Sequence, residues 1–168
     1  MSLDIVYDIP DQKVTSSRHT LAVLVDNEFG VLARVIGLFA GRGYNIESLT
    51  VAEVEHDDNL SRITIVTSGS EQVIKQIKHL LERLIPVHKV NDLTVEGEHT
   101  ERELAIVKIK PAEAALEIAK NANVRLLKQN QEYIMFEITD TSGNIDAFIG
   151  QMRQFTIIEM ARSGVVAI

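Results

Sequence analysis

The sequence predicts an α+β fold built from two ferredoxin-like βαββαβ domains in tandem. Segments with strand or helix periodicity follow one another as strand, helix, strand, strand, helix, strand. A polar, glycine-containing stretch at 96–99 comes next, and the same order then recurs. The 168 residues are enough for two small domains, each with an apolar core of its own.

The first half is predicted to hold strands at 20–25, 44–54, 62–67 and 87–95. The run at 20–25 is apolar on both faces, so we expect a strand buried on both sides. A helix follows Gly30 and ends at Gly41 and Gly43. Its predicted buried stripe comprises Leu32, Val35, Ile36 and Phe39.

The second helix is predicted to begin after Ser70, which is a favourable N-cap residue. Pro86 cannot continue the helix, so the helix ends before it. One face is apolar over the whole length and comprises Val73, Ile74, Ile77, Leu80, Leu81, Leu84 and Ile85.

The second half repeats the order of elements without repeating the sequence. Strands are predicted at 104–110, 124–128, 133–139 and 157–162, and helices at 112–121 and 142–152. Pro111 is expected at the first helical position of the shorter helix. The longer helix carries an apolar stripe of Ile145, Phe148, Ile149 and Met152. We therefore divide the chain into a polar lead-in at 1–17 and domains at 18–96 and 97–168.

Composition narrows the classes of function. A net charge of −7 argues against nucleic acid or an anionic membrane as the main partner, because neither would gain from counterion release. The absence of cysteine removes thiol catalysis, disulfides and cysteine-ligated metals. No apolar run reaches membrane-span length, and the N-terminus lacks the pattern of a signal peptide, so we expect a cytoplasmic protein.

No catalytic or metal-binding constellation stands out. The histidines are scattered, which favours surface or packing roles; they are His19, His56, His79, His88 and His99. Gly41-Arg42-Gly43 follows a helix instead of opening one, so it is not a phosphate cradle. The acidic hairpin turn fits a solvated turn better than a cation site; it contains Glu53, Glu55, Asp57 and Asp58. We expect no catalytic residue and no metal site.

The first strand-to-helix turn is the most informative segment. The N–H groups of Gly30, Val31 and Leu32 are predicted to point outward at a helix N-terminus, which suits a small carboxylate. Asp26 and Glu28 beside them would repel a phosphate and favour an ammonium group. A ligand with both charges is an α-amino acid, and Asn27 offers it a donor and an acceptor. Local chemistry alone leaves a second interpretation equally open, in which Asn27 and Gly30 only form the turn.

The sequence closely resembles a known family. The segment VLVDNEFGVLARVIGLFAGRGYNIESLTV at 23–51 is similar to the ACT domain of the small regulatory subunit of acetolactate synthase. LSRITIVTSG, ERELAIVKI, TSGNIDAFI and EMARSGVVAI also resemble that family, in its order. The resemblance runs from about residue 18 onward.

The resemblance implies a homodimeric subunit that does no chemistry itself. Such subunits bind a large catalytic subunit, which carries thiamine diphosphate, FAD and magnesium, and the small subunit holds no cofactor. They raise its activity and confer feedback inhibition by valine in branched-chain amino-acid biosynthesis. The effector lies between two ACT domains, held by Asn27 and Gly30 of one chain and Asn45 of the other. Val31, Leu32 and Ile46 would line the same site.

Two alternative functions belong to other classes of protein. An acylphosphatase on the same fold needs a cationic first turn, whereas this turn carries Asp26 and Glu28. A free-standing amino-acid-sensing ACT regulator would need a different partner or a DNA-binding element, and no helix-turn-helix pattern is visible.

Overall fold

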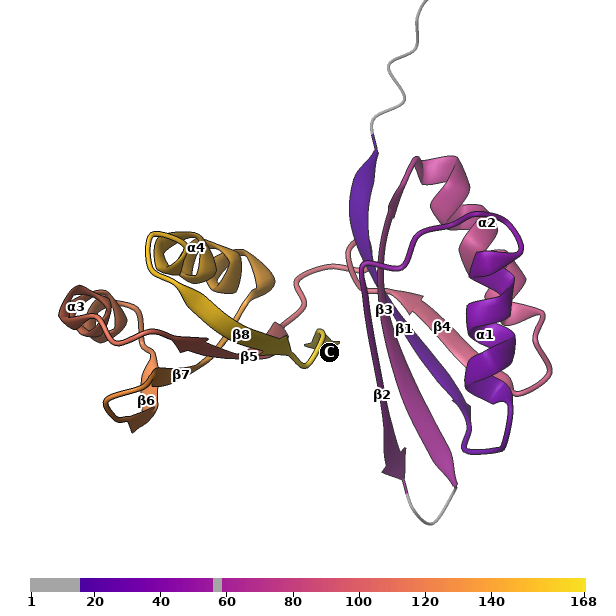
Figure 1. Ribbon diagram of the computed structural model, residues 1–168. Helices are drawn as coiled ribbons and strands as arrows, with labels where there is room; N and C mark the ends of the chain where they lie inside the picture. Colours follow the sequence, from indigo (N-terminus) through magenta and orange to yellow (C-terminus); the bar gives the residue numbers. More distant parts are fainter. Residues whose placement is uncertain (1–15, 56–58) are drawn as a thin grey trace, which may run out of the picture.

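The computed structural model describes residues 16–55 and 59–168 (Figure 1). The lead-in predicted at 1–17 lies almost wholly outside the described residues, as do Asp57 and Asp58 of the acidic turn. The described chain forms two βαββαβ units, each with both helices on one face of an antiparallel sheet. The predicted fold class is therefore confirmed.

The N-terminal unit has the sheet order β2-β3-β1-β4, so its first strand is central. Its elements are β1 (Ser17–Asp26), α1 (Val31–Ala40), β2 (Ser48–Glu55), β3 (Leu60–Gly69), α2 (Glu71–Glu82) and β4 (Val87–Asp92). Leu21, Val23 and Val25 of β1 face the helices and are buried. Ser70 caps α2 as predicted, its hydroxyl accepting the Val73 N–H at 3.3 Å.

The buried face of α1 differs from the predicted one. Val35 and Phe39 are buried, but Leu32 and Ile36 are 37% and 38% exposed. The buried positions in their place are Val31 and Leu38. Eight of the ten α1 residues are apolar, so helical spacing alone fits more than one stripe.

The end of α2 also differs from the prediction. The helix stops at Glu82, so Ile85 lies beyond it and is 96% exposed. The helix does end before Pro86, as predicted, but it ends four residues earlier, with Arg83 as its C-cap.

The C-terminal unit has the equivalent sheet order, β6-β7-β5-β8. Its elements are β5 (Glu101–Ile109), α3 (Glu113–Asn121), β6 (Arg125–Gln129), β7 (Ile134–Asp140), α4 (Ser142–Met152) and β8 (Ile157–Arg162). The predicted stripe of α4 is buried in full. The prediction for Pro111 was wrong: Ala112 is the N-cap of α3, so Pro111 precedes the helix by two residues.

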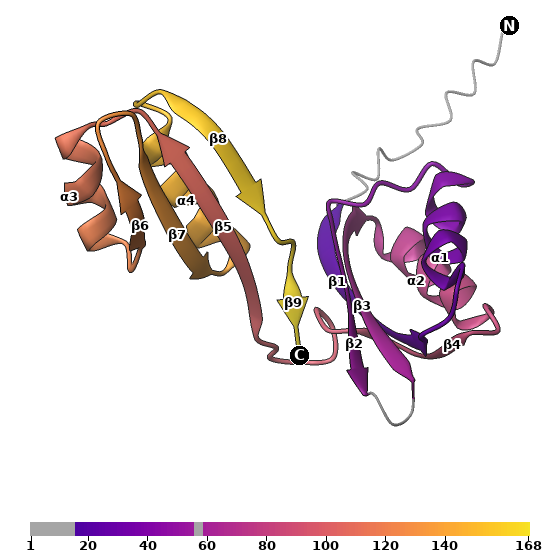
Figure 2. The same ribbon diagram turned by 60° about the horizontal axis from the view of Figure 1, so that its bottom comes forward.

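A short strand that the sequence did not predict joins the two units. β9 (Val166–Ala167) pairs with the start of β5 and lies beside the helix-free face of the N-terminal sheet (Figure 2). Val165 and Ala167 are buried there against Val66 of β3. Arg62 of β3 also holds this strand, because its Nη2 donates to the Ala167 carbonyl at 2.7 Å. The open face of the first sheet is thus partly covered by the chain's own end.

Candidate functional site

The turn between β1 and α1 has the strained geometry that its glycine allows. Gly30 is the N-cap of α1 with φ of 83°, a left-handed conformation that side chains with a Cβ rarely adopt. No side chain caps this helix end. The Val31 N–H, predicted to be free, makes a long bond to the Glu28 carbonyl at 3.4 Å. The turn therefore presents a helix N-terminus to solvent with little internal competition for its first donors.

The side chains at this turn divide between core and surface. Val31 is buried in the N-terminal core, so only its main chain remains at the turn. Leu32 is part-exposed beside it, and Asn27 is exposed. The Asn27 N–H donates to the Asn59 carbonyl at 2.8 Å, and Asn59 Nδ2 returns a bond to the Asn27 carbonyl at 3.3 Å. These bonds use the main chain of Asn27 and not its carboxamide.

Asn45 and Ile46 lie in the connection between α1 and β2. Thr67 of β3 holds this connection, because its hydroxyl donates to the Asn45 carbonyl at 2.6 Å. The Glu47 N–H continues the contact with a bond to the Val66 carbonyl at 2.8 Å. The Asn45 side chain is exposed, whereas Ile46 packs partly against the core.

The two groups of predicted site residues lie at opposite ends of the N-terminal sheet. Figure 1 shows the β1–α1 turn at one end and the α1–β2 connection at the other. The length of β3 gives the distance between the two groups. The Asn27 main chain is hydrogen-bonded to Asn59, just before β3 begins, and the Asn45 carbonyl is hydrogen-bonded to Thr67, near the other end of β3. At about 3.3 Å per strand residue, the two partners are roughly 25 Å apart. One amino acid cannot contact both asparagines of a single chain.

Large apolar side chains are exposed around the β1–α1 turn. Phe29 is 104% exposed, and Leu32 and Ile36 continue from it at helical spacing. The main chain brings Ile85 nearby, since the Asp26 N–H donates to the Pro86 carbonyl at 2.9 Å. A cluster of this kind at one end of a domain is typical of a surface that meets another chain.

Asp26 has a partner at the turn. Its Oδ1 lies 2.6 Å from His88 Nε2 of β4, and both side chains are part-exposed. Asp26 was expected to face the ammonium group of a ligand. In this structure the Asp26 carboxylate instead links β1 to β4. Glu28 is the other acidic side chain of the turn, and it makes no ion pair with the residues that the structure describes.

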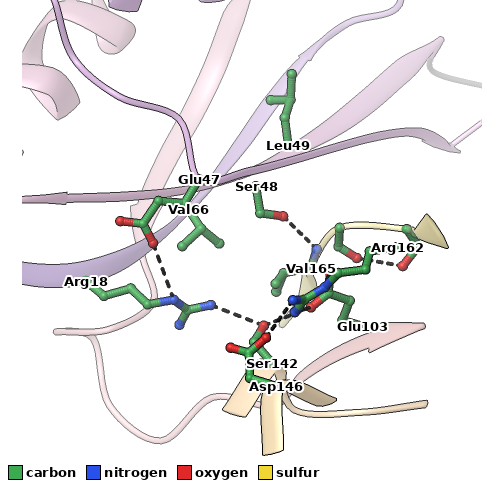
Figure 3. A pocket seen from close by; sticks show the side chains of 12 residues that line it. Arg18, Glu47, Ser48, Leu49, Val66, Glu103, Ser142, Asp146, Arg162 and Val165 are labelled. Atoms are coloured by element: carbon green, nitrogen blue, oxygen red, sulfur yellow. Dashed lines mark hydrogen bonds and ion pairs between the residues drawn. The ribbon is translucent and has the colours of Figure 1, made fainter. Parts of the chain in front are cut away.

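A second polar site lies between the two units and was missed by the sequence analysis (Figure 3). Arg162 holds the buried carboxylate of Glu103 through two bonds, Nε–Oε1 at 2.9 Å and Nη2–Oε2 at 2.5 Å. Its Nη1 also reaches Asp146 of α4 at 2.6 Å. The hydrogen bonds that the Arg162 guanidinium donates to Glu103 raise its pKa. The arrangement is an ion-pair cluster at the domain junction, in which Arg162 binds two carboxylates.

Arg18 connects that junction to the N-terminal unit. Its guanidinium donates to Glu101 at 3.3 Å and lies 4.0 Å from Glu47. The cavity between these groups measures about 450 Å³ and is lined from both units. Residues 83 positions apart meet here, so no local sequence pattern could have predicted it.

His19 has the packing role that the sequence analysis favoured for histidines. It is buried, with Nδ1 at 2.8 Å from Asp92 Oδ2 and Nε2 at 2.9 Å from Ser17 Oγ. A hydrolytic triad also links a serine, a histidine and an aspartate in this order. Such a triad needs, in addition, a substrate pocket with hydrogen-bond donors for the oxyanion. The interdomain cavity lies elsewhere, and Asp92 also caps the Thr94 N–H at 3.1 Å. The three side chains tie β1 to the end of β4.

Comparison with known proteins gives the same family for both units. The model of the AHAS small subunit-like ACT domain matches residues 21–89, and that of the small subunit of acetolactate synthase matches residues 102–168. The probable acetolactate synthase small subunit of Archaeoglobus fulgidus is 44% identical over 89% of this chain and 95% of its own length. The chain belongs to the acetolactate synthase small subunit family.

Further relatives support that membership. The isozyme 3 small subunit of Escherichia coli is 43% identical over 90% of this chain and 94% of its own. The crystal structure of the small subunit from Thermotoga maritima superposes with a TM-score of 0.80 at 33% identity, covering 90% and 96% of the two chains. The family is that of the small regulatory subunit and not that of the catalytic subunit. Among the described residues, no helix is long and apolar enough to span a membrane.

Proposed function

We propose that the chain binds the large catalytic subunit of acetolactate synthase, raises its activity and makes it sensitive to feedback inhibition by valine. Membership of the small subunit family supports the choice of partner. Thiamine diphosphate, FAD and magnesium belong to the catalytic subunit in this proposal, and this chain holds no cofactor.

The placement of Asn27 and Asn45 is the observation that carries the effector proposal. Both side chains are exposed, and they lie at opposite ends of one sheet. A site that uses both must therefore join two copies of the chain. Two-fold symmetry then generates two equivalent sites, because each copy supplies a turn to one site and an α1–β2 connection to the other.

Each part of valine has a matching group in such a site. The exposed N-terminus of α1 receives the carboxylate, with Gly30 allowing close approach of the main chain. Asn27 and Asn45 orient the polar groups, and Glu28 offers a charge to the ammonium group. Leu32 and Ile46 supply an apolar wall for the branched side chain. One methylene changes affinity by only about 1–3 kcal/mol, so leucine and isoleucine bind more weakly but measurably.

The exposed apolar cluster of Phe29, Leu32, Ile36 and Ile85 supports an interface at the same end of the domain. A second copy that brings its Asn45 to the turn also covers these side chains. We further propose that residues 18–96 and 97–168 are the two folding units, joined by the segment between β4 and β5.

Reconstitution with a catalytic subunit tests the function. Acetolactate formation is measured for the catalytic subunit alone, with this chain, and with this chain plus valine. The proposal predicts a higher rate on adding the chain and a loss of that rate on adding valine. A free-standing amino-acid sensor would bind valine but leave the rate of the catalytic subunit unchanged, and that outcome would contradict the proposal.

A further inference from the structure

Asn59, just before β3, has an unusual main-chain conformation for a residue with a side chain. Its φ of 51° lies in the left-handed region, and in the described part of the chain only Asn123 shares a positive φ among residues other than glycine. This conformation costs free energy for residues with a Cβ, although asparagine adopts it more readily than most. It persists only where surrounding contacts require it. For Asn59 those contacts are with the turn of the proposed effector site.

Asn59 extends the pairing of β1 with β3 into that turn. The ladder between the two strands ends at the pair of Asp26 and Leu60. One step further, the Asn27 N–H donates to the Asn59 carbonyl at 2.8 Å, and Asn59 Nδ2 donates to the Asn27 carbonyl at 3.3 Å. A regular hydrogen-bonded antiparallel pair exchanges two main-chain bonds. The Asn59 carboxamide therefore supplies the second bond, which a main-chain N–H supplies in a regular pair.

These two bonds hold both peptide groups that flank the Asn27 Cα. With its N–H and its carbonyl both bonded, the Asn27 main chain is fixed, and so is the direction of its Cα–Cβ bond. The Asn27 carboxamide makes no hydrogen bond with the residues that the structure describes, so its donor and acceptor remain available to a ligand.

Beyond Asn27, the turn has no further main-chain bond to the sheet among the described residues. Residues 28–30 bond only with the helix that follows, through the Glu28 and Gly30 carbonyls. Asn59 is therefore the last residue beside β1 that holds the turn. Its contact sets how the Asn27 carboxamide and the N-terminus of α1 face a ligand.

We propose that Asn59 is a positioning residue of the effector site, which acts by holding Asn27 and does not itself contact the ligand. This inference rests on the proposed function, because it takes Asn27 as a residue that binds the effector. The role needs a left-handed main chain together with a side-chain donor. Glycine and ionised aspartate both accept the left-handed conformation, but neither has the donor. Asparagine meets both needs.

Asn59→Gly and Asn59→Asp test the role, because both variants lose the donor and both tolerate the left-handed conformation. Titration calorimetry of the full chain measures valine affinity, and NMR follows hydrogen exchange of the Asn27 amide without valine. Each variant should bind valine about three- to tenfold more weakly, the loss expected for one neutral hydrogen bond. The Asn27 amide should exchange faster. Dimerisation and the urea midpoint of unfolding should stay close to those of the unchanged chain.

Asn130→Gly is the matched control. Asn130 forms the turn between β6 and β7 in the C-terminal unit, where its Oδ1 accepts the N–H groups of Glu132 and Tyr133 at 2.9 and 2.8 Å. The same substitution thus removes side-chain hydrogen bonds from a turn that is remote from the effector site. It should leave valine affinity within about twofold of that of the unchanged chain.

The inference would be overturned by valine affinity within about twofold of the unchanged chain in either Asn59 variant. A loss in Asn59→Asp alone would point to its added negative charge and not to the missing donor. Unchanged exchange of the Asn27 amide, or an equal loss of affinity in Asn130→Gly, would also overturn it. Failure of the proposed function looks different, because the unchanged chain itself would then not bind valine, whereas the exchange measurement would still show whether Asn59 holds Asn27.

Discussion

Ser48 and Val165 join the two units directly: Ser48 Oγ accepts the Val165 N–H at 2.9 Å. Ser48 opens β2 only three residues after Asn45, and the neighbouring Glu47 faces Arg18 at the domain junction. The connection proposed to hold the effector is thus anchored to the C-terminal segment. An effector bound at Asn45, as proposed, would contact a connection that is hydrogen-bonded to the C-terminal segment through Ser48.

Gly164→Ala tests the fit of the C-terminal segment against β2. Gly164 has φ of +81°, and a Cβ there would lie 2.7 Å from Thr50 Oγ1 and 3.0 Å from Ser48 Oγ. Strain and overlap should lower the free energy of unfolding by about 1–3 kcal/mol, measured by urea denaturation.

Gly150→Ala is the matched control for that variant. Gly150 lies within α4, and a Cβ there meets nothing within 4 Å. We expect a gain of about 0.5–1 kcal/mol, because alanine favours the helix. Equal stability of the two variants would show that the segment is not held against β2.

Arg162→Met tests the ion-pair cluster at the junction. The change leaves Glu103, which is 5% exposed, with the Ser142 hydroxyl as its only side-chain partner among the residues that the structure describes. Because a buried charge without its counterion is costly, we expect a loss of about 2–4 kcal/mol in the free energy of unfolding. Lys120→Met removes an exposed pair with Glu117 and should cost less than about 0.5 kcal/mol. If Arg162→Met lowered the free energy of unfolding as little as Lys120→Met does, the cluster would not stabilise the fold.

Phe29→Ser tests the exposed apolar cluster as an interface. Removing a fully exposed aromatic side chain should leave the folding of the chain unchanged but weaken self-association by about tenfold or more, as expected for an interface hot spot. Sedimentation equilibrium measures the effect. Ile158→Ser, at a 47% exposed position of the C-terminal unit, serves as the control and should associate normally. Unchanged association in Phe29→Ser would place the dimer interface elsewhere.

Asn45→Ala tests the effector site itself. The variant should bind valine about 1.5–3 kcal/mol more weakly, the loss typical of a hydrogen bond to a charged group, as measured by titration calorimetry. Dimerisation and stimulation of the catalytic subunit should persist, because the Asn45 side chain is exposed and makes no hydrogen bond with the residues that the structure describes. Unchanged valine affinity would remove Asn45 from the site.

Elements with clear local signals could be predicted from the sequence. α4 and β8 have the predicted bounds, since the apolar stripe of α4 and the apolar start of β8 each fit one periodicity. The cap at Ser70 follows from the affinity of its hydroxyl for a free helix N–H. The buried stripe of α1 was predicted only in part, with Val35 and Phe39 correct and Leu32 and Ile36 wrong, because an almost wholly apolar helix does not reveal which face will pack.

The contacts at the domain junction could not be predicted from the sequence, for a different reason. Glu103 and Arg162 are 59 residues apart, and β9 has only two residues. Glu103 and Arg162 meet because β5 pairs with β8, and β9 pairs with the start of β5; no local propensity encodes such long-range pairing. Among the proposed effector residues, Asn27 and Gly30 were indicated by the chemistry of the turn, whereas Asn45 and Ile46 were named from family resemblance alone. Only the structure shows that Asn27 and Asn45 are too far apart to serve one ligand within a chain.

Mixed dimers of Asn27→Ala and Asn45→Ala chains test the central claim most directly. Each variant alone has one defect in both of its sites, whereas a mixed dimer recovers one site with both asparagines intact. An equimolar mixture that exchanges freely should therefore regain full-affinity valine binding at about one quarter of its sites, measured by titration calorimetry. If both asparagines came from the same chain, every site would keep a defect, and no recovery on mixing would contradict the account.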